Sequence, residues 1–436
     1  MNTQPISEDQ PIPEDSRDLL RLTTAGSVDD GKSTLIGRLL ADSGALAADQ
    51  MASLAAAAVS EGTSEIDLAR ITDGLTAERE QGITIDVAYR YFSTPKRSFI
   101  LADVPGHEQY TRNMVTGASN ADAALFLVDA QNGMTPQTRR HVCIAALLGI
   151  DQVVFAINKM DLVDFSEAAY IQAKDEMKAF CEGLSFGTVH YVPVSAKKGD
   201  NVVATSASMP WYTDGPLINI LGNLSASATS FDGPFRMAVQ IAARPTHNPE
   251  DGDVASARGL MGRIASGRVR VGERVEIVPG NGKSTVTSIT TPQGPASQAV
   301  AGQSVTITLA DQIDVGRGHM LAAIDNPPRQ SREARALLCW LDNVPQDPRT
   351  PYLVRIGTKT LNARVAAPDF RIDTNTLDRV TDNAPLAAND IGETIIRLSD
   401  DIAFDPFDAN PATGAFLVID PRTNATVAAG MIESAL

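Results

Sequence analysis

Apolar runs alternate with helix-like patterns through the first half of the chain. Strands are predicted at the short apolar stretches 19–25, 99–102, 124–128, 153–157 and 189–194. Between them, apolar residues recur at helical spacing in the segments 32–40, 135–148 and 166–181. Because strands that alternate with helices are typical of βαβ units, this pattern predicts an α/β domain with a mainly parallel sheet.

The pattern changes after a polar, serine-rich stretch at 223–232, which is typical of a linker. Short segments of alternating apolar and polar residues follow, broken by Gly and Pro, at 235–244, 259–280, 304–310 and then from about 336 to 432. Such segments favour two β-barrels or sandwiches. The predicted organisation is a flexible tail at 1–18, the α/β domain at 19–225, a first β-barrel at 233–328 and a second at 332–436.

Composition narrows the class of protein. The 436 residues include 37 Lys and Arg against 53 Asp and Glu, a net charge of −16, which argues against a broad nucleic-acid-binding surface. The three cysteines, Cys143, Cys181 and Cys339, form no CxxC motif, so we expect a reducing compartment such as the cytoplasm. No apolar run is long enough to cross a bilayer, and the acidic, proline-containing N-terminus does not read as a signal peptide.

The tetrapeptide Gly-Lys-Ser-Thr occurs twice, at 31–34 and at 282–285. A phosphate-binding loop also needs a glycine five positions earlier, a strand before it and a helix after it. Residues 26–33 meet all three conditions. At the second occurrence Ile277 stands where that glycine is needed, and β-branched residues follow. Residues 279–282 therefore predict a hairpin turn, and the chain has one phosphate-binding loop.

The residue types of this loop explain its chemistry. Backbone N–H groups surround the β-phosphate, and the N-terminus of the following helix faces the anion. Lys32 reaches the β- and γ-phosphate oxygens, and the hydroxyl of Ser33 binds Mg²⁺. The predicted phosphate-binding residues are Gly26, Ser27, Val28, Asp29, Asp30, Gly31, Lys32, Ser33 and Thr34.

Three short motifs at predicted strand ends narrow the nucleotide to GTP. In "NKMD" the last aspartate can accept hydrogen bonds from N1–H and the exocyclic amine of guanine, a donor pair that adenine lacks. "SAK" can close over the base, and in "DVPGH" the aspartate can hold Mg²⁺ through water while the glycine N–H contacts the γ-phosphate. The residues are Asp103, Val104, Pro105, Gly106, His107, Asn158, Lys159, Met160, Asp161, Ser195, Ala196 and Lys197.

This constellation resembles the translational GTPase superfamily, which implies an α/β P-loop GTPase domain followed by two β-barrel domains. Within it, the chain is similar to the large, GTP-hydrolysing subunits of bacterial sulfate adenylyltransferases. The specific stretches are "DGLTAEREQGITIDVAYRYFST" at 73–94 and "DIAFDPFDANPATGAFLVID" at 401–420. "VDDGK" at 28–32, where translation factors usually have "VDHGK", favours the sulfate branch. The acidic stretch 246–259 resembles an insertion to which we assign no role.

The resemblance implies a role for individual residues. Mg²⁺ would be held by Ser33, Thr84 and, through water, Asp103. His107 would orient the water that attacks the γ-phosphate, and Lys32 and Thr84 would complete the catalytic set. Loss of the γ-phosphate would release the loops that contain Thr84 and Gly106.

The resemblance also implies a partner. GTP hydrolysis would be coupled to formation of adenylyl sulfate from ATP and sulfate, which is uphill by itself. A separate small subunit with an "SGGxDS" pyrophosphate loop would carry the adenylyl transfer, since this sequence contains no such motif. Two alternatives stay open: a translation-factor-like GTPase and a stand-alone GTPase that regulates an unrelated partner. No membrane or stable nucleic-acid partner is expected.

Overall fold

The computed structural model describes residues 18–46, 52, 68–71, 86–226, 233–243 and 258–436. Most of the predicted tail, Thr84 and nearly all of the acidic stretch 246–259 lie outside these residues. The chain forms two compact units, Met1–Ser227 and Ala228–Leu436. In the described part of the chain, no helix is long and apolar enough to cross a membrane.

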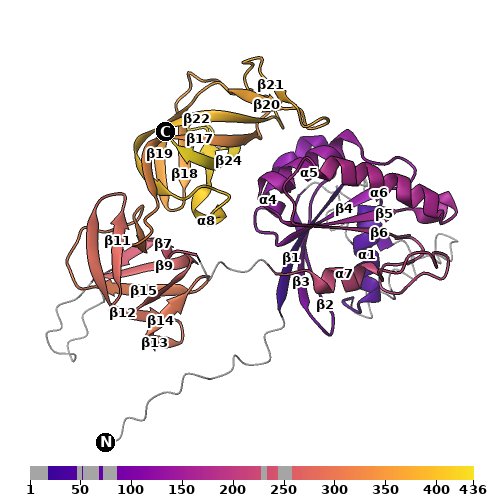
Figure 1. The fold of residues 1–436 in the computed structure, drawn as a ribbon, viewed down its shortest axis with the longest axis horizontal. Helices are drawn as coiled ribbons and strands as arrows, with labels where there is room; N and C mark the ends of the chain where they lie inside the picture. Colours follow the sequence, from indigo (N-terminus) through magenta and orange to yellow (C-terminus); the bar gives the residue numbers. More distant parts are fainter. Residues whose placement is uncertain (1–17, 47–51, 53–67, 72–85, 227–232, 244–257) are drawn as a thin grey trace, which may run out of the picture. The chain divides into compact units, whose positions relative to one another are not determined.

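The first unit is built on a six-stranded sheet with the strand order β2-β3-β1-β4-β5-β6 (Figure 1). The strands are β1 (Leu19–Gly26), β2 (Ala88–Ser93), β3 (Ser98–Asp103), β4 (Ala123–Asp129), β5 (Gln152–Asn158) and β6 (Thr188–Pro193). All neighbouring strands are parallel except β2, which runs antiparallel to β3. The predicted mainly parallel α/β sheet is confirmed.

Helices and short 3₁₀ turns connect these strands. They are α1 (Lys32–Asp42), α4 (Thr111–Ala118), α5 (Pro136–Leu147), α6 (Glu167–Cys181), α7 (Leu217–Asn223), η1 (Leu68–Ile71), η2 (Glu108–Tyr110) and η3 (Met160–Val163). Side-chain caps fix two of the starts: Thr135 accepts a hydrogen bond from the Thr138 N–H before α5, and Ser166 accepts one from the Ala169 N–H before α6. Strand β4 is buried along its whole length, as expected for a parallel strand covered on both faces.

The first barrel of the second unit is a closed ring of six strands, β11-β16-β7-β9-β15-β12, in which β12 pairs back with β11. Its strands are β7 (Arg236–Ala238), β8 (Ile241–Ala243), β9 (Gly259–Ser266), β10 (Arg268–Arg270), β11 (Arg274–Val278), β12 (Gly282–Thr291), β13 (Gly294–Ala296), β14 (Gln298–Val300), β15 (Ser304–Leu309) and β16 (Met320–Ala323).

The second Gly-Lys-Ser-Thr lies in this barrel. Strands β11 and β12 are antiparallel neighbours with Ile277 opposite Gly282, so residues 279–281 form the turn of a hairpin. Lys283 is exposed on strand β12 and does not precede a helix. The prediction of a single phosphate-binding loop is therefore confirmed for this stretch.

The second barrel closes in the same way, in the order β17-β24-β23-β18-β19-β22 with β22 paired to β17. Its elements are β17 (Arg329–Trp340), β18 (Tyr352–Ile356), β19 (Lys359–Val365), β20 (Phe370–Ile372), β21 (Arg379–Val380), β22 (Ile391–Phe404), α8 (Pro411–Gly414), β23 (Ala415–Ile419) and β24 (Thr426–Ala435). Trp340, Tyr352 and Phe404 belong to its core. The two predicted barrels are thus confirmed.

A buried ion pair joins the two barrels. Arg236 of β7 is fully buried, and its Nε and Nη2 each donate a hydrogen bond of 2.9 Å to the carboxylate of Asp405, which follows β22. Thr413 Oγ1 donates a further bond of 2.8 Å to Asp405. This bidentate contact fixes the first barrel against the second.

Candidate functional site

The predicted nucleotide-binding motifs meet at one edge of the sheet. Gly26 ends β1, Asp103 ends β3 and Asn158 ends β5, while Ser195 follows β6. Because these strands are parallel, their carboxyl ends lie at the same edge, where open α/β sheets bind their ligands. The structure therefore brings together the phosphate loop and the motifs "DVPGH", "NKMD" and "SAK".

The phosphate loop is shaped by a glycine and an aspartate. Gly31 has φ +88°, a left-handed conformation that L side chains rarely adopt, and α1 begins at the next residue. A Cβ at Gly31 would lie 2.5 Å from Nδ2 of Asn158. Asp30 Oδ2 accepts a hydrogen bond of 2.7 Å from the Ser27 N–H, which holds the turn from within.

Lys32 and Asp103 lie together beside this loop. The Nζ of Lys32 donates to Oδ1 of Asp103, and the two side chains are only 7% and 1% exposed. The loop that follows Asp103 packs closely on the phosphate loop, because a Cβ at Gly106 would lie 2.8 Å from the Gly26 carbonyl oxygen. A lysine and a carboxylate are thus held where two backbone loops approach each other.

Asn158 joins the remaining motifs. Its Nδ2 donates to the Asp30 carbonyl at 2.7 Å, and its Oδ1 accepts from the Ala196 N–H at 2.9 Å. Ser195 Oγ donates to Oδ1 of Asp161 at 2.7 Å, so the "SAK" segment is also tied to the "NKMD" aspartate. Asp161 is half-buried, which leaves its carboxylate accessible to a base.

Comparison with known proteins identifies the family. Residues 17–240 match the model "Elongation factor Tu GTP binding domain", 260–318 match "Elongation factor Tu domain 2" and 333–433 match "GTP-eEF1A C-terminal domain-like". "Sulfate adenylyltransferase subunit 1" of Teredinibacter turnerae is 47% identical over 422 residues, which cover 96% of this chain and 88% of that protein. The protein of the same name from Shewanella woodyi is 45% identical with the same coverage. This chain belongs to the sulfate adenylyltransferase subunit 1 family.

A longer relative carries the same region. "Bifunctional enzyme CysN/CysC" of Mycobacterium tuberculosis is 46% identical over 415 residues, which cover 95% of this chain and 67% of that protein. The resemblance stated from the sequence is thus confirmed, for the branch as well as for the superfamily.

In this member of the sulfate adenylyltransferase subunit 1 family, the site residues fit a nucleoside triphosphate with Mg²⁺. At Gly31 and Gly106 the backbone approaches its surroundings so closely that a Cβ would collide, as expected where backbone surrounds a phosphate. Lys32 and Asp103 supply the cation and the carboxylate that phosphate oxygens and a hydrated Mg²⁺ require. Ser33 is half-buried at the start of α1, and Thr34 follows it.

The other predicted site residues lie around this centre. Val28 and Asp29 are exposed in the phosphate loop, and Lys197 is exposed after β6. Val104 and Pro105 are buried. His107 is half-buried, and its ring lies edge-on to Tyr110 with centroids 6.3 Å apart. Lys159 has φ +63° and Met160 is fully buried. Thr84 lies outside the described residues.

Sequence reasoning missed Arg38 and Asp129. Arg38 of α1 donates from Nε to the Ala196 carbonyl at 3.2 Å and from Nη2 to the Lys197 carbonyl at 2.6 Å. Asp129 ends β4 and accepts a hydrogen bond of 2.8 Å from Lys159 Nζ. Asp129 had a signal, because it ends an apolar strand as Asp103 does. Arg38 had none, because its acceptors are backbone carbonyls.

Proposed function

We propose that this chain is the GTP-hydrolysing subunit of a sulfate adenylyltransferase and couples GTP hydrolysis to formation of adenylyl sulfate from ATP and sulfate. The observation that carries the proposal is that Lys32, Asp103 and Asp161 lie at the same edge of the sheet, where the parallel strands end. It is supported by relatives named sulfate adenylyltransferase subunit 1 at 45% to 47% identity.

Each residue has a defined task in this proposal. Lys32 would turn from Asp103 to the β- and γ-phosphate oxygens, and Asp161 would accept the two donors of guanine. Ser33, Thr84 and, through water, Asp103 would hold Mg²⁺. When bound, Mg²⁺ would neutralise charge that develops on the phosphate oxygens during hydrolysis.

His107 would orient the attacking water. Its ring is half-buried and contacts the ring of Tyr110 edge-on. In the chain, His107 follows the buried residues 103–105, where β3 ends. Because the ring is partly shielded from bulk solvent, fewer other water molecules compete for its hydrogen bond to the attacking water. The neighbouring Gly106 would donate its N–H to the γ-phosphate, so that hydrolysis changes the contacts of the whole 103–107 loop.

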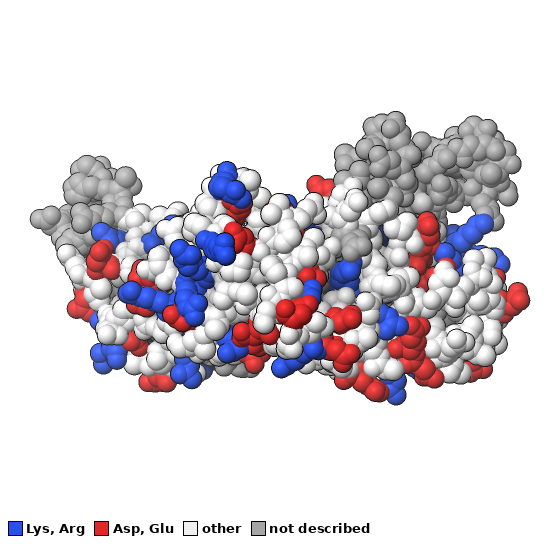
Figure 2. Space-filling view, turned by 90° about the horizontal axis from the view of Figure 1, so that it is seen from above, with Lys and Arg blue, Asp and Glu red and all other residues white. Residues whose placement is uncertain are grey.

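A separate subunit would carry out the adenylyl transfer. The printed name "subunit 1" of the relatives supports a partner, and we propose that it contains the pyrophosphate loop absent from this sequence. We place the assembly in the cytoplasm, in line with three buried cysteines that form no disulfide. Lys and Arg are interspersed with Asp and Glu on the face drawn in Figure 2. The relatives named sulfate adenylyltransferase subunit 1 favour the proposal over a translation-factor-like GTPase.

Reconstitution tests the coupling. The chain is purified with its adenylyltransferase partner, and adenylyl sulfate is measured with and without GTP. We expect GTP to raise product formation by roughly tenfold or more, within the usual range of coupling between sites. Lys32→Ala should remove this stimulation while the two subunits still co-purify.

The second Gly-Lys-Ser-Thr provides a matched control. Lys283→Ala changes the same residue in the same tetrapeptide, but on an exposed barrel strand. It should leave stimulation by GTP unchanged. Equal product with and without GTP would overturn the coupling, as would a Lys32→Ala variant that behaves like Lys283→Ala.

A further inference from the structure

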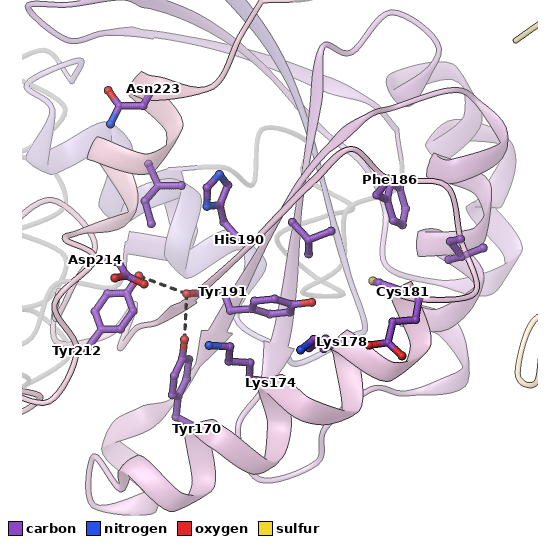
Figure 3. Close-up of a pocket in the computed structure, with 14 residues that line it drawn as sticks. Tyr170, Lys174, Lys178, Cys181, Phe186, His190, Tyr191, Tyr212, Asp214 and Asn223 are labelled. Carbon is purple, nitrogen blue, oxygen red and sulfur yellow. Dashed lines mark hydrogen bonds between the residues drawn. The ribbon is translucent and has the colours of Figure 1, made fainter.

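A groove of about 760 Å³ lies in the first unit, between α6 and strand β6 (Figure 3). Strand β6 is the last strand of the sheet in the described part of the chain. Its lining includes Tyr170, Lys174, Lys178, Phe186, Tyr191 and Tyr212. The groove shares no lining residue with the predicted nucleotide site, and its volume lies in the range of small-molecule sites.

Two lysines of α6 reach into this groove. Lys174 Nζ lies 5.7 Å from the ring centroid of Tyr170 and 5.9 Å from that of Tyr191. Lys178 follows one helical turn later and points into the same space in Figure 3. Like charges at this spacing weaken a helix slightly, so their placement does not serve helix stability.

The two lysines share this groove with two carboxylates but form no ion pair with them among the described residues. Glu182 and Asp214 also belong to the lining. Among the described residues, neither Lys174 nor Lys178 takes part in an ion pair with them or with any other carboxylate. The ammonium group of Lys174 lies beside two tyrosine rings and that of Lys178 belongs to the same lining, so both can pair with an anion in the groove.

The aromatic wall is fixed in place before any ligand arrives. The Tyr191 carbonyl accepts hydrogen bonds from the hydroxyls of Tyr170 at 3.2 Å and Tyr212 at 3.3 Å (Figure 3). The ring of Tyr191 stacks on Phe155 with centroids 5.6 Å apart and planes 8° apart. A rigid wall lowers the entropy that is lost when a flat ligand packs against it.

We propose that this groove binds a small organic anion with a flat ring, of the class of aromatic sulfonates and sulfate or phosphate esters. The ring would pack against Phe186, and the anionic group would lie between Lys174 and Lys178. The site is independent of the nucleotide site and of the function proposed above, because it uses none of the same residues.

Titration with 1-anilinonaphthalene-8-sulfonate tests the proposal. The probe is a flat aromatic sulfonate whose fluorescence rises on binding, and the full chain is first saturated with GDP so that the phosphate loop is occupied. We expect one saturable site. The double variant Lys174→Ala/Lys178→Ala should weaken binding about tenfold or more, because it removes both charged donors. Phe186→Ala should weaken it through loss of the ring contact.

Two controls separate this site from general stickiness. Lys96→Ala removes an exposed lysine from the turn between β2 and β3 and should leave the affinity unchanged. The uncharged parent compound N-phenyl-1-naphthylamine should bind the wild type and the double lysine variant equally. Far-UV circular dichroism confirms that each variant is folded. Sulfonate binding that is not saturable, or that is the same in the double lysine variant and the wild type, would overturn the proposal.

Discussion

Asp30 is the residue of the phosphate loop whose charge is most strongly affected by folding. Its side chain is 4% exposed, and burial is the main reason that its pKa is raised to about 7. The Ser27 N–H, which donates to Asp30, opposes this shift, while the carboxylate of Asp129 adds to it. Without a ligand, the folded chain therefore favours the protonated form of Asp30 at mildly acidic pH.

Asp30→Asn should change how stability depends on pH. An unfolded aspartate has a pKa of about 3.9. Below that pH the carboxyl is protonated in both the folded and the unfolded state, so Asp30 does not lower the free energy of unfolding. Between about 4 and 7 only the unfolded chain releases the proton, so stability falls as pH rises and the loss is complete above the folded pKa. Asparagine has no proton to release, and at pH 8 the variant should be more stable by up to about 4 kcal/mol.

Urea unfolding of the nucleotide-free chain at pH 5 and pH 8 measures this difference. Asp29→Asn is the matched control, because its side chain is exposed in the same loop and should change the free energy of unfolding by less than about 0.5 kcal/mol. A wild type whose stability does not fall between these pH values, or an Asp30→Asn variant with the same fall, would contradict the argument.

Motif spacing was enough to predict where the site residues meet, but not which side chains hold them. Gly26, Asp103 and Asn158 follow from strands that end in recognisable motifs. Arg38 could not be derived in this way, because its contacts are to carbonyls of Ala196 and Lys197, more than 150 positions away. Backbone acceptors carry no sequence signature, so such supports become visible only in three dimensions.

At the scale of elements, apolar runs predicted five of the six strands of the sheet, including the edge strand β6, but missed the other edge strand, β2. Strand β2 was not predicted, because it exposes Tyr89 at 49% and Tyr91 at 68% and therefore lacks a continuous apolar run. In the barrels, alternation indicated strands but could not give their order. Closure of the second ring depends on the pairing of β17 with β22, two segments far apart in the sequence that the pattern does not mark as partners.

The ion pair between the barrels gives a prediction at this scale. Asp405→Asn leaves the guanidinium of Arg236 buried without its anionic partner, which typically costs about 3 to 5 kcal/mol. We expect a loss of this order in the free energy of unfolding measured with urea. Asp401→Asn breaks an exposed ion pair between Asp401 of β22 and Arg332 of β17, and it should cost less than about 1 kcal/mol.

Replacing both partners distinguishes a lost charge pair from a general defect at this position. Arg236→Met/Asp405→Leu removes the uncompensated charge, so the double variant should be more stable than Asp405→Asn alone. If the double variant is as unstable as the single one, packing rather than charge accounts for the loss, and the electrostatic explanation is wrong.

At the scale of the whole molecule, the sheet of the first unit has a buried core and each barrel of the second unit has another, while the predicted GTP site lies only in the first unit. A ligand stabilises the part that binds it, by about 2.7 kcal/mol when its concentration is one hundred times the dissociation constant. Scanning calorimetry of the full chain should therefore show two transitions, and Mg²⁺ with GDP should raise the midpoint temperature of only one of them.

Asp405→Asn should lower the midpoint temperature of only the other transition, because the Arg236 contact lies wholly in the second unit. The matched change in the first unit is Lys32→Ala, which should abolish the shift caused by nucleotide and leave the second transition in place. A single transition, or two that move together with nucleotide, would show that the units unfold as one and that the separation into independent cores is wrong.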